Sequence, residues 1–390
     1  MKIGIDKLGF YVPHLYVDMN KLAVARNIEP AKFTIGIGQE KMALAPITQD
    51  PVTLAANAAL GILDETDKEK IDFVIFATET GIDHSKSAAV YVHHLVGLNP
   101  HARCIEVKHA CYGATAAIQM AKGHVALNPE SKVLVLGSDI ARYGLNTSGE
   151  ATQGAGAVAM VISADPKVIA LEAQSTYLTD DIMDFWRPNY SDKAFVDGKF
   201  SNEQYILFFS KMWEQYKEKT GLDLNDFEAL CFHLPYTKMG MKALKTVLDE
   251  GTEATQQRLA ANYKISAEYN KNVGNIYTGS LYLSLLSLLE QKEDLQAGSR
   301  IGLFSYGSGA VGEFFTGILQ AGFQDHLYVE EHKGLFTSRT EVSVPEYEEI
   351  FQETLPTDGS NIEFNIDKDP AAICLVGMTD NMRNYVNKLR

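Results

Sequence analysis

The sequence has few cysteines, fewer basic than acidic residues and no long apolar run, and each shortage excludes a class of protein. Its four cysteines, at positions 104, 111, 231 and 374, lack the paired spacing of a disulfide framework, which predicts a reducing compartment. A net charge of −15 argues against a general binder of nucleic acids or anionic membranes, although a local basic cluster could still hold a small anion. No apolar run approaches the roughly 20 residues of a membrane span, and the first residues, MKIGIDKLGFYVP, lack the apolar core of a signal peptide. We therefore expect a cytoplasmic protein.

The order of apolar runs predicts an α/β protein with an internal duplication. Residues 71–78 read as a strand buried on both faces that ends at Glu79, and residues 227–232 read as another that ends at His233. In each half a polar residue, a helix and a glycine-initiated strand follow in the same order. Because sites in α/β folds gather at the C-terminal ends of strands, Glu79, Cys111, His233 and Asn275 are expected to meet.

The predicted division is an N-terminal half, residues 1–165, and a C-terminal half, residues 166–390. Residues 178–226 interrupt the repeat and are interpreted as an insertion covering the site. The acidic tail, residues 326–390, is interpreted as a peripheral cap. Residues 29–46 carry two glycines and are expected to form an irregular functional loop.

Cys111 is the centre of the functional hypothesis. It lies between a predicted strand that contains Ile105 and Val107 and a predicted helix that begins near Gly113. Unpaired N–H groups and the dipole at a helix N-terminus favour a thiolate, which is the nucleophilic form of cysteine. The alternative is a buried cysteine that packs as a small apolar residue.

A cysteine, a glutamate and a histidine in one pocket suit covalent acyl chemistry. The thiol of Cys111 can exchange acyl groups with a thioester, and a carboxyl group such as Glu79 can take a proton from a carbon next to a carbonyl. A backbone N–H at Ser308, in SYGSGAV, can stabilise an oxyanion. The alternatives are a surface or capping role for Glu79 and a satisfied buried role for His233. No set of residues has zinc-ligand spacing, so no metal site is predicted.

Lys238, Lys242 and Lys245 recur at helical spacing shortly after His233 and would form one positive stripe. The stripe is either a clamp for a phosphorylated ligand or a solvated helix face. The glycine-rich segments GAGAV and GSGAV lead into strands rather than out of a strand into a helix, so they do not predict a dinucleotide site.

Motifs along nearly the whole chain resemble the bacterial 3-hydroxy-3-methylglutaryl-CoA (HMG-CoA) synthase family, a branch of the thiolase superfamily. They are ACYGATAA (110–117), YGLN (143–146), TQGAGAVAMVI (152–162), DFWRP (184–188), VDGKFS (196–201), FHLPYTKMGMKAL (232–244), VGNIYTGSLYLSLLSLLE (273–290) and GLFSYGSGAVGEFF (302–315). The resemblance implies a duplicated α/β/α/β/α core and condensation of acetyl-CoA with acetoacetyl-CoA to HMG-CoA, in the mevalonate route to isoprenoids. It also implies a homodimer without a metal or redox cofactor.

The resemblance also implies roles for individual residues. Cys111 would be the nucleophile that becomes acetylated, Glu79 the acid/base, and His233 the residue that binds the acetoacetyl group. The implied substrate-binding and supporting positions are Glu29, Pro30, Asp139, Tyr143, Thr152, Asp184, Ser201, Lys238, Lys242, Asn275 and Ser308. Three residues depart from the family pattern: His109 replaces a glutamate or glutamine, Ala151 a proline, and Met183 a tyrosine.

Three other functions remain open at this point. A thiolase would need a second active-site cysteine. A ketoacyl synthase would need a His–Asn or a His–His set. A catalytically silent CoA-binding protein would keep the lysines but would not need Cys111 or Glu79. A cysteine hydrolase would need a His–Asn/Asp pair to orient the base, and no such pair is evident.

Overall fold

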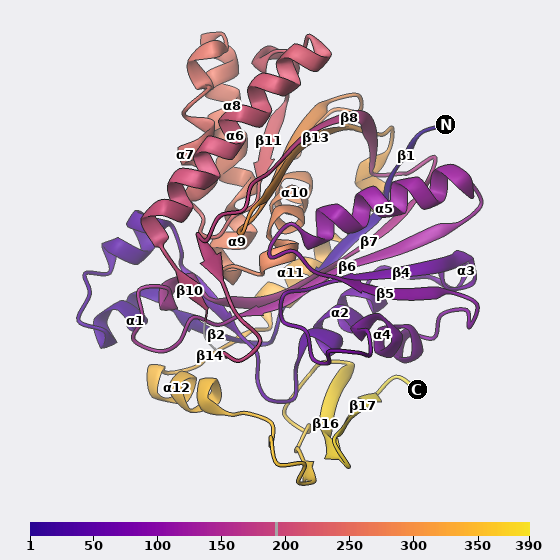
Figure 1. Cartoon of the computed structure of the whole chain (residues 1–390), viewed down its shortest axis with the longest axis vertical. Helices are drawn as coiled ribbons and strands as arrows, with labels where there is room; N and C mark the ends of the chain where they lie inside the picture. Colours follow the sequence, from indigo (N-terminus) through magenta and orange to yellow (C-terminus); the bar gives the residue numbers. More distant parts are fainter. Residues whose placement is uncertain (192–193) are drawn as a thin grey trace.

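The computed structural model describes residues 1–191 and 194–390 and is built on one nine-stranded mixed sheet (Figure 1). The strand order is β11-β12-β13-β8-β1-β7-β6-β4-β5. Its strands are β1 (Ile3–Tyr11), β4 (Ile71–Ala77), β5 (Arg103–Val107), β6 (Lys132–Ala141), β7 (Gly154–Ala164), β8 (Ile169–Thr179), β11 (Ala229–Phe232), β12 (Arg300–Gly307) and β13 (Val311–Leu319).

The strand order confirms the predicted duplication. From the centre outward, β1, β7, β6 and β4 of the first half correspond to β8, β13, β12 and β11 of the second. The strand directions also correspond, because β4–β6 and β11–β12 are parallel whereas β6–β7 and β12–β13 are antiparallel. Only two residue pairs, Gly4–Ala170 and Ile5–Ile169, join β1 to β8. The sheet therefore consists of two half-sheets joined along a narrow seam.

Helices cover both half-sheets and also fill the space between them (Figure 1). Their bounds are α1 (Met19–Ala25), α2 (Pro51–Leu60), α3 (Glu65–Lys70), α4 (Ala88–Val96), α5 (Gly113–Leu127), α6 (Gly198–Thr220), α7 (Met239–Leu244), α8 (Glu253–Ser266), α9 (Glu268–Val273), α10 (Ser280–Gln291), α11 (Val329–Thr337) and α12 (Val344–Gln352). α5 and α10 share one core with strands of both halves. α2 and α4 pack on the outer face of the first half-sheet, and α6, α7 and α8 on that of the second. These layers match the predicted α/β/α/β/α core.

The small residues of α5 explain why it can lie in the middle layer. Ala114, Ala117 and Ala121 are fully buried, and their short side chains let the helix approach strands on either side. The neighbouring α10 contributes larger side chains to this layer, and every residue from Ser280 to Leu289 is buried. Such a helix, which is mostly apolar and buried on every side, is expected in the interior of a protein.

Shorter strands complete the fold. They are β2 (Leu15–Asp18), β3 (Lys41–Leu44), β9 (Phe185–Trp186), β10 (Phe195–Val196), β14 (Thr340–Glu341), β15 (Ile362–Glu363), β16 (Ile373–Thr379) and β17 (Met382–Asn387). The predicted irregular loop at 29–46 contains β3, which pairs with β2, and a π-helical turn at Lys32–Ile37. This segment is therefore more regular than its glycines suggested.

The predicted insertion at 178–226 contains the hairpin of β9 and β10 and the whole of α6; its residues 192 and 193 lie outside the described residues. α6 packs on β8 and β13, much as α2 packs on β1 and β7 in the first half. The long helix is thus an element of the repeat, and the part of the segment that precedes it reaches the site.

The tail docks on the first half of the chain, although it follows the second half in sequence. Asn57 of α2 exchanges hydrogen bonds with the backbone of Ile373 in β16. Asp50, at the start of α2, accepts hydrogen bonds from Arg383 (2.6 Å) and Tyr385 (2.7 Å) of β17. In residues 1–191 and 194–390, no helix is both long and apolar enough to cross a membrane.

Candidate active site

The predicted catalytic residues occupy corresponding places in the two halves. Glu79 follows β4, and His233 directly follows the counterpart strand β11. Cys111 lies between β5 and α5, and Asn275 lies between α9 and α10. Glu79 and His233 therefore follow matching strands of the two half-sheets, whereas Cys111 and Asn275 precede the two helices of the middle layer.

Cys111 and Glu79 form the central contact of the site. The Sγ atom of Cys111 donates a hydrogen bond to Oε1 of Glu79 at 3.4 Å. Burial, followed by the nearby carboxylate of Asp139, raises the pKa of Glu79 to about 8. Burial and the carboxyl groups of Glu79 and Asp139 also hold the pKa of the Cys111 thiol well above its usual value. The expected thiolate is therefore wrong for this state: Cys111 is a protonated thiol beside a potential base.

Asp139 links the segment that carries Glu79 to the second half of the chain through hydrogen bonds. Its fully buried carboxylate accepts hydrogen bonds from the backbone N–H of Glu79 (2.8 Å) and from the N–H and hydroxyl of Thr80. The hydroxyl of Thr78 donates to the same oxygen at 2.8 Å. The other oxygen accepts from the N–H and hydroxyl of Thr278, which belongs to the second half. Asp139 therefore fixes the Glu79 backbone relative to the turn that follows Asn275.

Tyr143 and Asn275 line the same region. The ring of Tyr143 lies edge-on to that of Tyr277, with centroids 6.1 Å apart, and is near Phe185 of β9. Burial raises the pKa of Tyr143, and the nearby carboxyl group of Glu79 adds to that effect. The Oδ1 atom of Asn275 accepts from the N–H of Tyr277 at 2.8 Å, which leaves the Asn275 amide group to act as a donor.

Asp184 fixes the glycine-rich turn that carries Ser308. Its fully buried carboxylate accepts hydrogen bonds from Ser201 Oγ (3.0 Å), the Tyr306 hydroxyl (2.9 Å) and the N–H of Gly309 (2.8 Å). Ser201 therefore contacts the predicted site through Asp184 in this structure.

The turn with Ser308 lies directly against the nucleophile. A Cβ atom on Gly307 would come within 2.7 Å of the backbone nitrogen of Tyr112, so only glycine permits this approach. His109 lies beside the same turn, and its Nε2 atom is buried without a hydrogen-bond partner in the described part of the chain. Burial lowers the pKa of His109, so this residue adds no positive charge near Cys111 at neutral pH.

His233 is a neutral imidazole. Its side chain is almost fully buried, and burial lowers its pKa to about 3. The backbone N–H of His233 donates to the carbonyl of Phe304, and the backbone carbonyl of His233 accepts from the Tyr205 hydroxyl at 2.6 Å. The Nδ1 atom has no partner among the described residues. A neutral ring of this kind can donate one N–H to a carbonyl oxygen.

The remaining predicted ligand residues form two groups. The N–H of Lys238 donates to the carbonyl of Ile37 at 3.0 Å, so the turn that follows Glu29 and Pro30 lies beside the start of α7. Lys242 is exposed, and its ammonium group donates to the Tyr236 hydroxyl at 2.8 Å. The two lysines and the 29–38 segment thus form one surface.

Thr152 forms the second group, in a short 3-10 turn where its hydroxyl donates to the carbonyl of Gly149. The two other departures from the family pattern lie outside the central contact. Ala151 is buried in a small core with α1 and α12, and Met183 is 61% exposed.

Sequence reasoning missed Arg187, whose guanidinium donates to the backbone carbonyl of Glu79 and whose charge opposes the rise in the Glu79 pKa. The motif DFWRP contained it, but no spacing rule linked it to Glu79. It also missed Thr278, which bonds to Asp139. A group of at least three residues able to hold a metal ion is absent from residues 1–191 and 194–390.

Comparisons with known proteins agree with this geometry. The family model for the hydroxymethylglutaryl-coenzyme A synthase N terminal matches residues 1–167, and that for the C terminal matches residues 168–262 and 244–360. A hydroxymethylglutaryl-CoA synthase from Enterococcus faecalis is 58% identical over 358 residues, which cover 92% of this chain and 94% of that protein.

Two solved structures are similar along almost their whole length. A crystal structure of an HMG-CoA synthase complexed with CoA is 46% identical, with a TM-score of 0.96, and covers 99% of this chain and 100% of that one. A structure of MvaS in complex with 3-hydroxy-3-methylglutaryl coenzyme A is 34% identical, with a TM-score of 0.90 and 99% coverage of both chains. The duplicated layers, the Cys111–Glu79 contact and the family matches along the chain agree: this protein belongs to the hydroxymethylglutaryl-CoA synthase family.

Proposed function

We propose that the protein condenses acetyl-CoA with acetoacetyl-CoA and water to give HMG-CoA and CoA, through an acetyl group carried on Cys111. The observation that carries this proposal is the contact between the Cys111 thiol and a carboxyl group whose pKa is raised to about 8. Such a carboxyl group can both accept and return a proton near neutral pH.

In the first step, Cys111 attacks the carbonyl of acetyl-CoA, and a new S–C bond forms as the bond to the CoA sulfur breaks. The thiol proton passes to Glu79, its hydrogen-bond partner, and then to the departing CoA thiolate, so the exchange of one thioester for another is balanced. The backbone N–H of Ser308, in the turn beside Cys111, would donate to the oxyanion of the intermediate.

In the second step, Glu79 removes a proton from the acetyl methyl group, and the resulting enolate attacks the ketone carbon of acetoacetyl-CoA. Neutral His233 donates a hydrogen bond to the ketone oxygen, and the Asn275 amide is a further donor. Glu79 returns its proton to the new alkoxide. Water then hydrolyses the thioester at Cys111 and releases HMG-CoA.

The rest of the proposal concerns the setting of this reaction. The steps use only protein acids, bases and thioesters, so we propose no metal or redox cofactor. We also propose a cytoplasmic homodimer in the mevalonate route to isoprenoids, as the family resemblance implies. The exposed lysines of α7 would bind the phosphates of CoA, which the chain's net charge of −15 would otherwise repel.

Mass spectrometry of the protein mixed with acetyl-CoA alone, and again after addition of acetoacetyl-CoA, tests the proposed reaction. We expect an acetyl adduct of the Cys111 peptide that disappears as HMG-CoA forms. An adduct that is discharged to another product would point to a thiolase-like reaction instead. Binding of CoA without any adduct would support the silent CoA-binding alternative.

Replacing Lys242 with glutamate is expected to raise KM for the CoA esters about threefold to tenfold while kcat changes little. The exposed side chain would meet a phosphate rather than the reacting atoms, so the change should also shrink as salt is added. Steady-state kinetics at two salt concentrations measure it. Lys167→Glu, in the turn between β7 and β8, is the matched charge reversal. Equal KM values for the two variants would make the α7 lysines an ordinary solvated face.

A further inference from the structure

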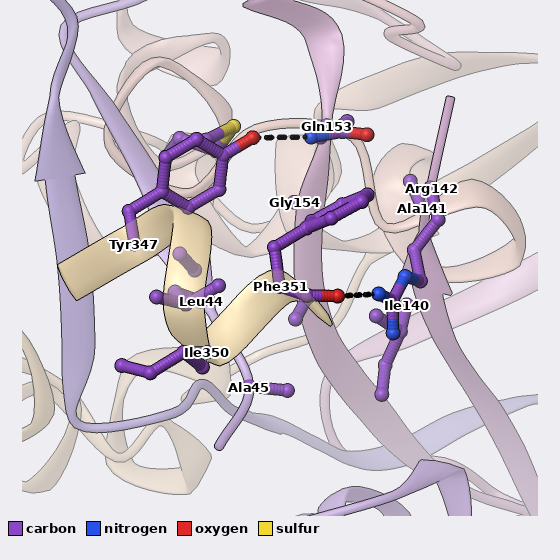
Figure 2. Close-up of a pocket in the computed structure, with 13 residues that line it drawn as sticks. Leu44, Ala45, Ile140, Ala141, Arg142, Gln153, Gly154, Tyr347, Ile350 and Phe351 are labelled. Atoms are coloured by element: carbon purple, nitrogen blue, oxygen red, sulfur yellow. Dashed lines mark hydrogen bonds between the residues drawn. The ribbon is translucent and has the colours of Figure 1, made fainter. Parts of the chain in front are cut away.

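Helix α12 of the C-terminal tail reaches the back of the loop that carries Tyr143. Figure 2 shows its Tyr347, Ile350 and Phe351 beside residues at the ends of β6 and β7, around a pocket. None of Glu79, Cys111 and His233 lines this pocket. The pocket therefore lies behind the loop of residues 143–153, called the active-site loop below, and not in the active site itself.

Tyr347 is the buried anchor of this contact. Its side chain is completely inaccessible to solvent, and its hydroxyl accepts a hydrogen bond from Nε2 of Gln153 at 2.9 Å (Figure 2). The same hydroxyl donates to Oε1 of Glu150 at 3.1 Å. A buried tyrosine hydroxyl with both hydrogen-bonding roles satisfied has one preferred orientation.

Gln153 connects Tyr347 to the backbone of the active-site loop. Its Oε1 atom accepts the backbone N–H of Tyr143 at 2.7 Å and that of Gly144 at 3.1 Å. Gln153 is 3% exposed, so water cannot readily replace either partner. One side chain thus joins the hydroxyl of Tyr347 to the peptide groups that place the Tyr143 ring.

A second set of bonds holds the other end of the loop. Glu150 is 3% exposed, accepts the N–H of Asn146 at 3.0 Å and forms a two-bond ion pair with Arg26 of the first half. Arg26 also pairs with Glu348 of α12 at 2.6 Å. The loop from 143 to 153 is therefore clamped to α12 at two points rather than merely covered by it.

We propose that Tyr347 and Gln153 are positioning residues for the reaction: through them, helix α12 sets where Tyr143 stands beside Cys111 and Glu79. This inference rests on the proposed function, because it requires that the Tyr143 ring contributes to the chemistry at Cys111. Tyr347 and Gln153 do not touch the substrate. They act through the backbone of Tyr143, so their loss should change kcat more than KM.

Tyr347→Phe removes only the hydroxyl that joins α12 to Gln153, and we expect it to lower kcat for HMG-CoA formation about threefold to tenfold with little change in KM. The acetylation rate of Cys111, followed by mass spectrometry at saturating acetyl-CoA, should fall with it. Tyr216→Phe is the matched control: Tyr216 is 1% exposed, and its hydroxyl bonds to Thr316 at 2.9 Å on the outer side of the second half. The control should keep the wild-type kcat even if its melting temperature falls equally.

Gln153→Met removes the amide at nearly constant length, and combining it with Tyr347→Phe tests whether the two act as one unit. We expect the combined effect on kcat to be smaller than the product of the two single effects, because the hydrogen bond between Tyr347 and Gln153 is lost in both single variants, whereas the bond from Tyr347 to Glu150 is lost only in Tyr347→Phe. A kcat of Tyr347→Phe equal to that of Tyr216→Phe, or strictly additive effects, would overturn the inference. If the wild-type protein forms no HMG-CoA, the proposed function itself fails, which is a separate outcome.

Discussion

Replacing Cys111 with alanine is expected to lower kcat for HMG-CoA formation by at least about 10⁴-fold and to remove the acetyl adduct completely. Among the described residues, Cys111 is the one thiol that contacts a carboxyl group with a raised pKa. Alanine leaves Glu79 without a thiol to deprotonate, and no acyl group can then be carried. Single-turnover mass spectrometry with acetyl-CoA measures the adduct directly.

Cys104→Ala is the matched control for this experiment. Cys104 lies in β5, seven residues before Cys111, is partly buried, and has a pKa raised by burial alone. Its loss should leave both the adduct and kcat close to wild type. Acetylation that persists in Cys111→Ala, or turnover within tenfold of wild type, would require a different nucleophile.

Replacing Glu79 with glutamine is expected to separate the two chemical steps. Condensation should slow about 10²- to 10⁴-fold, because the amide cannot take the proton of the acetyl methyl group. The acetyl adduct on Cys111 should still form. The charge of Glu79 is one cause of the high Cys111 pKa, so its removal makes the thiol easier to ionise and partly offsets the lost base. Acetylation and HMG-CoA release are measured separately.

The pH dependence tests the same assignment. The basic form of Glu79 is the carboxylate, and its pKa is about 8, so condensation by the wild-type protein should speed up as pH rises through that value. In Glu79→Gln this rise should disappear. Glu106→Gln is the control, since Glu106 is a partly buried carboxyl of β5 whose pKa is also raised by burial. A rise that survives in Glu79→Gln would assign it to another group.

The sequence predicted the main strands well because their apolar runs are long and end in polar residues. β4 and β11 begin and end within two residues of the predicted ranges, and they deliver Glu79 and His233 to matching positions. The junction at Cys111 was also predicted, because a strand pattern changes to a helical one over a few small residues. The hydrophobic periodicity and the residue composition of these segments were sufficient to predict these features.

The ionisation of the site could not be predicted in the same way. A helix N-terminus favours a thiolate, but the three-dimensional structure adds burial and the carboxyl groups of Glu79 and Asp139, which together outweigh it. Those carboxyl groups lie 32 residues before (111 − 79) and 28 residues after (139 − 111) the cysteine in the chain. Local patterns therefore fixed where the thiol lies but not the direction of its pKa shift.

Contacts between distant segments were the other feature beyond the reach of local patterns. The hydrogen bonds that join Tyr347 to Gln153 and Asp50 to Arg383 cross 194 and 333 residues of chain. Neither contact produces a hydrophobic periodicity or a residue spacing that is recognisable in the sequence. The tail was consequently predicted as a peripheral cap, and its bonds to the active-site loop became evident only in the structure.

The docking of the tail on the first half has a consequence for the order in which the protein is made. A ribosome delivers Cys111, Glu79 and the Tyr143 loop long before it delivers α12 and the strands β16 and β17. Until those segments emerge, Gln153 and Asp50 lack their partners from the tail. The nascent chain therefore holds its nucleophile early but completes the support around it only after α12, β16 and β17 have emerged.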